Sequence, residues 1–266
     1  MASAASLRPE RPARRPPRLT VAWAALTGGA TLVGAATLIG SLALSGLPAR
    51  AGSGVTITSY GHSALMIRGG GASVLVNPFK AVGCAAGLAE PRVGASVILA
   101  SSRLLDEGAP VASGKFLADP GSYRVAGLKI EGIAAPHDRV GGRRFGLSTL
   151  WRWEQGGLSF AHLGGTAARL SPSDKVMLGR PDVLILGVGG GAKVYDASEA
   201  AEIVRELQPR VVIPVQYTAG SAPQDCDQGG VEPFLQAMGG TPVRRPGRSL
   251  SLPGQLADGP VIEVMR

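Results

Sequence analysis

The sequence predicts an α/β domain made of two sheets packed together, preceded by a separate N-terminal segment. Residues 55–163 hold short alternating or apolar runs separated by turns, many of them glycine-containing, as antiparallel strands do. Residues 182–215 hold two continuous apolar runs on either side of a helical pattern, which is typical of strands buried on both faces. A chain of 266 residues is long enough for one substantial domain, which we place at residues 52–266.

Residues 1–51 combine a basic, Pro-rich head with a long uncharged run. Of the 27 bases and 19 acids in the whole chain, six Arg and one Glu lie here, which leaves 21 and 18 for residues 52–266. Residues 19–49 carry no charge, and about 20 apolar residues suffice to cross a bilayer. We expect a membrane anchor or an export signal cleaved near Ala49-Arg50-Ala51, with organelle import as a third option. Arg-rich flanks tend to stay in the cytoplasm, which predicts the domain on the non-cytoplasmic side, as in a periplasm or a thylakoid lumen.

The charge and cysteine content limit the function classes. The net charge of +8 lies mostly in residues 1–51, and no patch of Arg and Lys with interleaved aromatic residues appears, which argues against nucleic acid as a partner. Cys84 and Cys226 are the only cysteines. They either pair, as an oxidising compartment permits, or remain free thiols. Two cysteines alone do not make a structural zinc site.

The first part of the domain is predicted to be a series of strands. Asn77-Pro78 ends the third of them, because proline has no N–H to donate to a ladder, and an irregular loop follows at 80–94. Aromatic residues in an alternating pattern support a long strand at 144–153. The predicted strands span residues 55–60, 64–68, 73–76, 97–100, 116–118, 123–126, 128–133, 144–153 and 158–163.

The second part is predicted to alternate helices with buried strands. Asp196 and Glu199 form a capping-box pattern at the start of a helix, and Ser171 begins a shorter one. The apolar face of the longer helix recurs at helical spacing, at Ala200, Ile203, Val204 and Leu207. The other predicted elements are strands at 182–187, 211–215 and 261–265 and a helix at 231–238.

Five turns carry the polar residues of the domain. They are Tyr60-Gly61-His62-Ser63, residues 101–107, Pro136-His137-Asp138, Ala161-His162-Leu163-Gly164-Gly165 and Pro214-Val215-Gln216-Tyr217. With these turns in this order and spacing, residues 55–240 resemble the metallo-β-lactamase superfamily, specifically its ascorbate-6-phosphate lactonase-like branch of metal-dependent hydrolases. The resemblance implies a four-layer αββα sandwich with a metal site at one edge of its two sheets.

The family's metal ligands are mostly missing from these turns. The family uses a Thr-His-x-His-x-Asp-His turn, a later His, an Asp after Gly and a final His before Tyr, which bind zinc or a similar ion that supplies hydroxide. At the four positions of the first turn this chain has Ser101, Arg103, Leu105 and Asp106 or, shifted by one residue, Ser102, Leu104, Asp106 and Glu107. Gly165 replaces the later Asp, Gln216 replaces the final His, and only His137 keeps its place. We therefore expect no two-metal site, no bound zinc and no other cofactor.

The polar residues that remain are candidates for a remodelled site. His62, His137, Asp106, Glu107 and Gln216 are candidates for catalysis, and Arg103, Asp138 and His162 are candidates for ligand binding. Several also have a structural interpretation: His62 as a turn residue, His162 as a core residue, and Asp138 as part of a solvated pair with Arg139.

Two function classes follow from the sequence. We expect an exported or membrane-anchored protein that binds a small molecule or a protein without catalysis; the alternative is a hydrolase with a remodelled, metal-poor or metal-free site. Residues 187–192 also match the dinucleotide pattern G-x-G-x-x-A. The helix that follows is predicted to begin at Asp196, beyond the glycines, so its N-terminus does not meet a pyrophosphate there.

Overall fold

The computed structural model describes residues 52–266. The predicted basic head and the predicted signal or anchor, at residues 1–51, lie outside the described residues. Within residues 52–266 no helix is long and apolar enough to cross a membrane.

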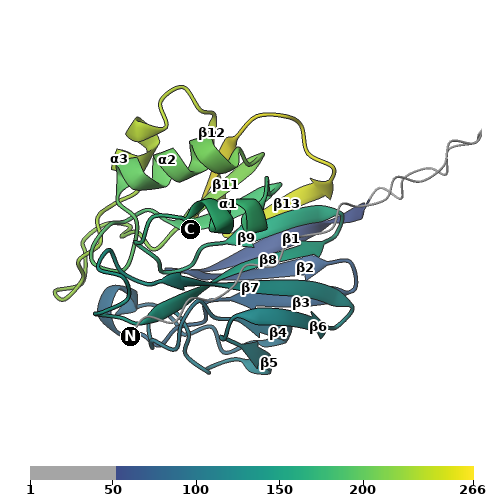
Figure 1. Cartoon of the computed structure of the whole chain (residues 1–266), viewed down its shortest axis with the longest axis horizontal. Coiled ribbons are helices and arrows are strands. Elements are labelled where there is room, and N and C mark those ends of the chain that lie inside the picture. The colour runs from purple at the N-terminus through teal and green to yellow at the C-terminus, as the bar shows by residue number, and fades with distance from the viewer. Residues whose placement is uncertain (1–51) are drawn as a thin grey trace, which may run out of the picture. The chain divides into compact units, whose positions relative to one another are not determined.

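The first of two mixed sheets has six strands in the order β13-β1-β2-β3-β4-β5 (Figure 1). Strands β13, β1, β2 and β3 pair antiparallel, and β3, β4 and β5 pair in parallel. The sheet contains β1 (Gly52–Gly61), β2 (Ala64–Gly69), β3 (Ala72–Val76), β4 (Gly94–Leu99), β5 (Ser113–Leu117) and β13 (Ser249–Gly254).

The second sheet has eight strands in the order β12-β14-β11-β10-β9-β8-β7-β6. Its first half in sequence is the predicted meander of β6 (Gly121–Val125), β7 (Leu128–Pro136), β8 (Leu147–Gln155) and β9 (Leu158–His162), which pair antiparallel. Its second half is parallel and contains β10 (Val183–Gly187), β11 (Val211–Val215), β12 (Val243–Gly247) and β14 (Val261–Met265).

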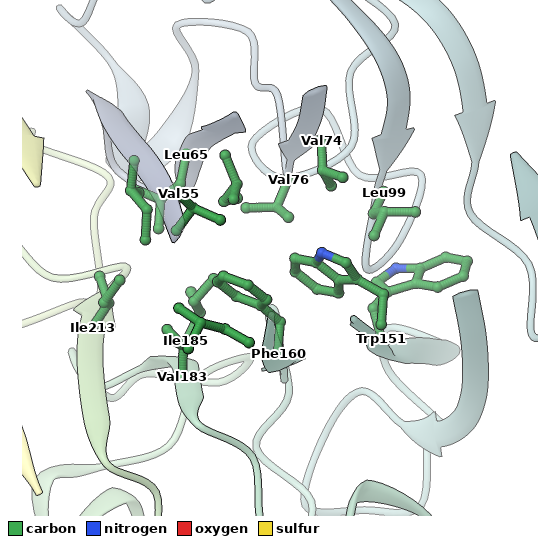
Figure 2. Close-up of a cluster of buried hydrophobic side chains, with 14 of the residues drawn as sticks. Val55, Leu65, Val74, Val76, Leu99, Trp151, Phe160, Val183, Ile185 and Ile213 are labelled. Atoms are coloured by element: carbon green, nitrogen blue, oxygen red, sulfur yellow. The ribbon is translucent and has the colours of Figure 1, made fainter. Parts of the chain in front are cut away.

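The inner faces of the two sheets meet in the main hydrophobic core. Figure 2 shows Leu65 and Val76 of the first sheet opposite Phe160 and Ile185 of the second. Trp153 stacks on Phe160 with 4.9 Å between the ring centroids. Because alternate residues of each strand enter this core, the register of every inner strand is fixed, and the strand ends that carry the polar turns are fixed with it.

Helices α1 (Pro172–Leu178), α2 (Ala197–Leu207) and α3 (Glu232–Ala237) follow in the second part of the chain, where α1 contacts β7 and α2 contacts β10 and α3. The predicted capping boxes are present at Ser171 and at Asp196. The apolar face of α2 packs with Leu184, Val212 and Ile262 on the outer face of the second sheet. The helix ends at Leu207, before Pro209, as the sequence predicts.

The outer face of the first sheet differs from the predicted αββα arrangement. Met66, Leu75 and Ile98 are buried there beneath loop residues such as Val93 and Ala112. In the part of the chain that the structure describes, this layer contains loops and the short 3-10 helix η1 (Gly83–Ala85) rather than an α-helix.

Two strands are absent from the sequence prediction. β12 and β13 both contain proline and glycine, which weaken a strand pattern. Each lies at the edge of its sheet, where one side of the strand has no neighbour and proline costs no ladder hydrogen bond. Among the predicted strands, the boundaries also shift: β4 begins at Gly94 rather than residue 97, and β8 at Leu147 rather than residue 144.

Candidate functional site

The five polar turns meet at one end of the sandwich. The backbone N–H of Gln216 donates to the carbonyl of His62 at 2.9 Å, which joins the turns after β11 and β1. The N–H of Gly165 lies 3.3 Å from Ser101 Oγ, which joins the turns after β9 and β4. The turns that the family resemblance singled out therefore lie close together in the fold.

The turn after β4 is fixed by hydrogen bonds from both sheets. Asn77, after β3, accepts from the Ser101 N–H at 2.8 Å and donates to its hydroxyl at 2.9 Å. From the second sheet, Trp151 Nε1 donates to the carbonyl of Ala100 at 3.0 Å, and Thr149 N–H donates to that of Ser101 at 2.7 Å. These hydrogen bonds fix the start of the turn that leads to Glu107.

Glu107 lies at that centre and is fully buried. Its Oε1 accepts from the Ser102 hydroxyl at 2.6 Å and lies 3.0 Å from His137 Nε2. Its Oε2 accepts from Gln216 Nε2 at 2.9 Å. Side chains from three different turns therefore surround one carboxylate.

The surroundings of Glu107 favour its charged form. Burial raises the pKa of Glu107, but the hydrogen bond and charge of His137, the Ser102 hydroxyl and the charge of Lys193 outweigh burial, so that the pKa lies below its ordinary value. The carboxylate is consequently an anion near neutral pH.

The carboxylate of Glu107 occupies space that a side chain at position 165 would need. A Cβ built on Gly165 would lie 1.7 Å from Glu107 Oε2, far inside van der Waals contact. A Cβ on the neighbouring Gly164 would lie 2.1 Å from Ser101 Cβ. The absence of side chains at these two positions is what allows the turn after β4 to approach the end of β9.

His62 and His162 flank the centre as neutral side chains. Burial lowers the pKa of His62, against the charges of Asp106 and Glu107, and burial lowers the pKa of His162 to about 4. Both ring nitrogens of His162 are buried and have no hydrogen-bond partner among the described residues. The ring of His62 packs edge-on against Phe79, with 5.8 Å between centroids.

Asp106 and Lys193 form an ion pair beside this centre. Lys193 comes from the segment after the glycine-rich turn that follows β10, and both side chains are mostly buried. The Lys193 ammonium lowers the pKa of both Glu107 and His62, so it acts on the centre as a fixed cation.

Two of the predicted ligand-binding residues lie elsewhere. The hypothesis that Arg103 contributes to ligand binding is not supported, because its exposed side chain pairs with Asp119 at 2.8 Å. Asp138 is buried, not solvated with Arg139: its carboxylate accepts from the backbone N–H groups of residues 140, 142, 144 and 145 and organises that loop. Arg139 pairs instead with Glu199.

The sequence did not single out Lys193, and it gave Ser102 only an alternative ligand position. Ser101 and Ser102 were alternatives, because the register of this turn was ambiguous. The one available signal for Lys193 was a lone cation just after a glycine-rich turn at the end of a buried strand.

The cysteines form a disulfide, which decides between the two states left open by the sequence. Cys84, in η1, bonds Cys226, in the loop after β11, and 142 residues separate them in the chain. The disulfide therefore ties together two irregular segments that border the site.

The side chains around Glu107 are not arranged as the ligands of a metal ion. Among residues 52–266, no group of three or more His, Cys, Asp or Glu side chains is arranged to hold a metal ion. Two of the side chains that meet at the centre, Ser102 and Gln216, instead donate hydrogen bonds to Glu107. The ring nitrogens of His137 and His162 have no hydrogen-bond partner among the described residues, although His137 Nε2 lies 3.0 Å from Glu107 Oε1.

The contact between Glu107 and Gly165 predicts a strongly non-additive pair of substitutions. Gly165→Ala should destabilise the protein by about 2 kcal/mol or more, because the methyl group overlaps Glu107. In a Glu107→Ala background the same change should cost less than about 1 kcal/mol, since the overlapping atoms are gone. Urea unfolding of the four proteins measures both costs, and equal costs would show that Glu107 does not occupy this space.

The low pKa of His162 predicts a loss of stability on acidification. Between pH 6.5, the unfolded pKa, and about pH 4, the unfolded chain binds a proton that the folded chain does not. The free energy of unfolding therefore decreases as the pH is lowered through this window, by up to about 3 kcal/mol. His162→Gln, which stays neutral, should flatten this fall without changing the slope between pH 7 and 9. Urea unfolding at several pH values tests this, and an unchanged slope below pH 6.5 would contradict it.

The comparison with family models identifies the fold independently. Residues 56–216 match the model described as "Beta-lactamase superfamily domain". A comparison with curated proteins gave no match.

Solved structures with the same fold include several hydrolases. A putative Zn-dependent hydrolase of the metallo-β-lactamase superfamily from Thermotoga maritima is 24% identical, with a TM-score of 0.62 over 80% of this chain and 100% of that chain. A putative metal-dependent hydrolase from Parabacteroides distasonis is 19% identical, with a TM-score of 0.52 over 70% and 89%. An isothiocyanate hydrolase from Delia radicum gut bacteria is 12% identical, with a TM-score of 0.51 over 67% and 90%. At these identities the structural matches show the fold, and together with the family match they show that the chain belongs to the metallo-β-lactamase-fold superfamily of hydrolases.

Proposed function

We propose that this protein is a non-catalytic member of its family that serves as a binding or scaffold protein. In this proposal a polar cluster centred on Glu107 replaces the family's metal centre. The observation that carries the proposal is the position of the Glu107 carboxylate, which lies where a side chain at position 165 would project and is surrounded by Ser102, His137 and Gln216.

The chemistry of the donor set supports this proposal. A metal centre needs several imidazoles or carboxylates with free lone pairs. Here Gln216 directs an N–H donor at Glu107, and Lys193 places an ammonium near it. Donors and a cation at this point repel a metal ion, so the residues present do not fit the family's two-metal centre.

The burial of the cluster also supports a non-catalytic role. The side chains of Glu107 and His137 are fully buried, as is Gln216. A group that acts on a substrate must come within hydrogen-bond reach of it, and a substrate does not reach groups that contact only protein.

The alternative of a remodelled hydrolase has weaker support. Ser102, Glu107 and His137 are close together, as in a nucleophile–base arrangement. However, the carboxylate that accepts from the Ser102 hydroxyl has a lowered pKa, which makes it a weak base. Ser102 is also buried, so a substrate does not reach its hydroxyl.

We also propose that the domain is exported or remains anchored on the non-cytoplasmic side of a membrane. The Cys84–Cys226 disulfide supports this, because such bonds persist in oxidising compartments and are rare in the cytosol.

Metal analysis of the purified protein tests the proposed loss of the metal centre. Cells expressing the full chain are grown with added zinc, manganese and iron, and the protein is purified without chelators. We expect well below one equivalent of total metal per chain, and the same thermal midpoint with and without added zinc. Two tightly bound equivalents, or a midpoint that chelator lowers, would overturn the proposal.

A further inference from the structure

We propose that a cavity beside the Glu107 cluster binds a small, largely apolar molecule that is uncharged or carries one negative charge. The proposal rests on the binding role proposed above and names the kind of ligand. The cavity has a volume of about 430 Å³, within the range of about 300–1,000 Å³ that is usual for small-molecule sites.

The walls of this cavity come from four separate segments of the chain. They are the turn between β1 and β2, the loop after β3, the loop after β11 and the end of β14. Apolar side chains dominate the lining, among them Leu65, Leu88, Val215 and Met265. Strand ends fix two of these walls before a ligand arrives, which lowers the entropy lost on binding.

Leu88 shows why the cavity favours an apolar occupant. Its side chain lies over Gly61, where a Cβ would come within 3.4 Å of Leu88 Cδ1, and the glycine leaves that space open. Leu88 nevertheless remains 39% exposed in the free protein. A ligand that covers this side chain removes apolar surface from water, which favours binding.

The side chains that line the cavity disfavour a cationic ligand. None of the described residues that line it is an Asp or Glu, and Arg266 is the cationic side chain among them. His62 is neutral because burial lowers its pKa. The lining therefore favours a neutral molecule or a single anion over a cation, although Asp227 lies just behind Cys84.

The disulfide is a second, independent feature of the same cavity. Cys84 lines the cavity, and its bond to Cys226 joins the loop after β3 to the loop after β11, both of which contribute lining residues. The covalent link therefore restricts how far these two segments can move apart.

The proposed site touches the polar cluster through one residue. His62 lines the cavity, while Glu107, His137 and Gln216 do not. Substitutions in the cavity wall can therefore test ligand binding without changing the cluster.

Fluorescence titration of the full, oxidised chain with the neutral dye N-phenylnaphthylamine tests the proposal. The dye is excited at a wavelength that tryptophan does not absorb. We expect saturable binding of one dye per chain. Ala86→Trp and Ala219→Trp, which add bulk to two different segments that line the cavity, should each weaken binding at least tenfold. Ala89→Trp is the matched control, because Ala89 is exposed in the same loop as Ala86 but does not line the cavity, and it should bind as the wild type does.

Two outcomes would overturn the proposal. One is that the wild type shows no saturable dye binding. The other is that the wild type and both cavity-filling variants bind the dye with equal affinity. Metal analysis of the same samples separates this failure from that of the proposed function. If the protein is metal-free and does not bind the dye, the proposed ligand site is wrong but the proposed loss of the metal centre is not.

The contribution of the disulfide is measured in the same titration. Cys84→Ser combined with Cys226→Ser should weaken dye binding several-fold while circular dichroism stays unchanged, because the loops lose their link but the sandwich does not. The anionic dye anilinonaphthalene sulfonate should compete with the neutral dye, and a cationic analogue should not. Competition by the cationic analogue would contradict the proposed ligand class.

Discussion

A buried carboxylate must find hydrogen-bond donors inside the protein, and the arrangement of this site follows from how Glu107 finds them. Ser102, His137 and Gln216 reach it from the turns after three different strands. Removing any one of them leaves part of a buried anion without a partner, which is costly in a medium of low dielectric constant. The same contacts therefore stabilise the end of the sandwich and close it to solvent.

The electrostatics of the cluster are balanced by the chain's own residues. Asp106 has Lys193 as its counter-charge, and Glu107 has the hydrogen bonds described above. His62 and His162 remain neutral because burial opposes their protonation. In the proposed function, the Lys193 ammonium and several N–H and O–H donors supply the positive charge that metal ions supply in the family. The neighbouring cavity, in contrast, is apolar and has room for a ligand.

Much of the fold followed from the sequence because periodic patterns and capping residues act locally. The capping box at Asp196 and the apolar face of α2 were both confirmed. β12 and β13 were missed, since edge strands tolerate the proline and glycine that normally argue against a strand. Within the site, the sequence identified Glu107, His137 and Gln216 as candidates but not how they contact one another. Arg103 could not be placed, because one residue of register decides whether a side chain in the turn points inward or, as it does, toward Asp119. The salt bridge of Lys193 joins residues that are 87 apart, and no local pattern predicts such a contact.

A crystal structure of the protein grown in zinc, with anomalous data collected at the zinc edge, shows directly whether a metal binds among these side chains. Glu107 Oε1 should stay within hydrogen-bond distance of Ser102 and His137, and no anomalous peak should lie among Glu107, His137 and Gln216. A zinc peak at that position, with the Glu107 side chain displaced from Gly165 or bound to the metal, would contradict the proposed loss of the metal centre.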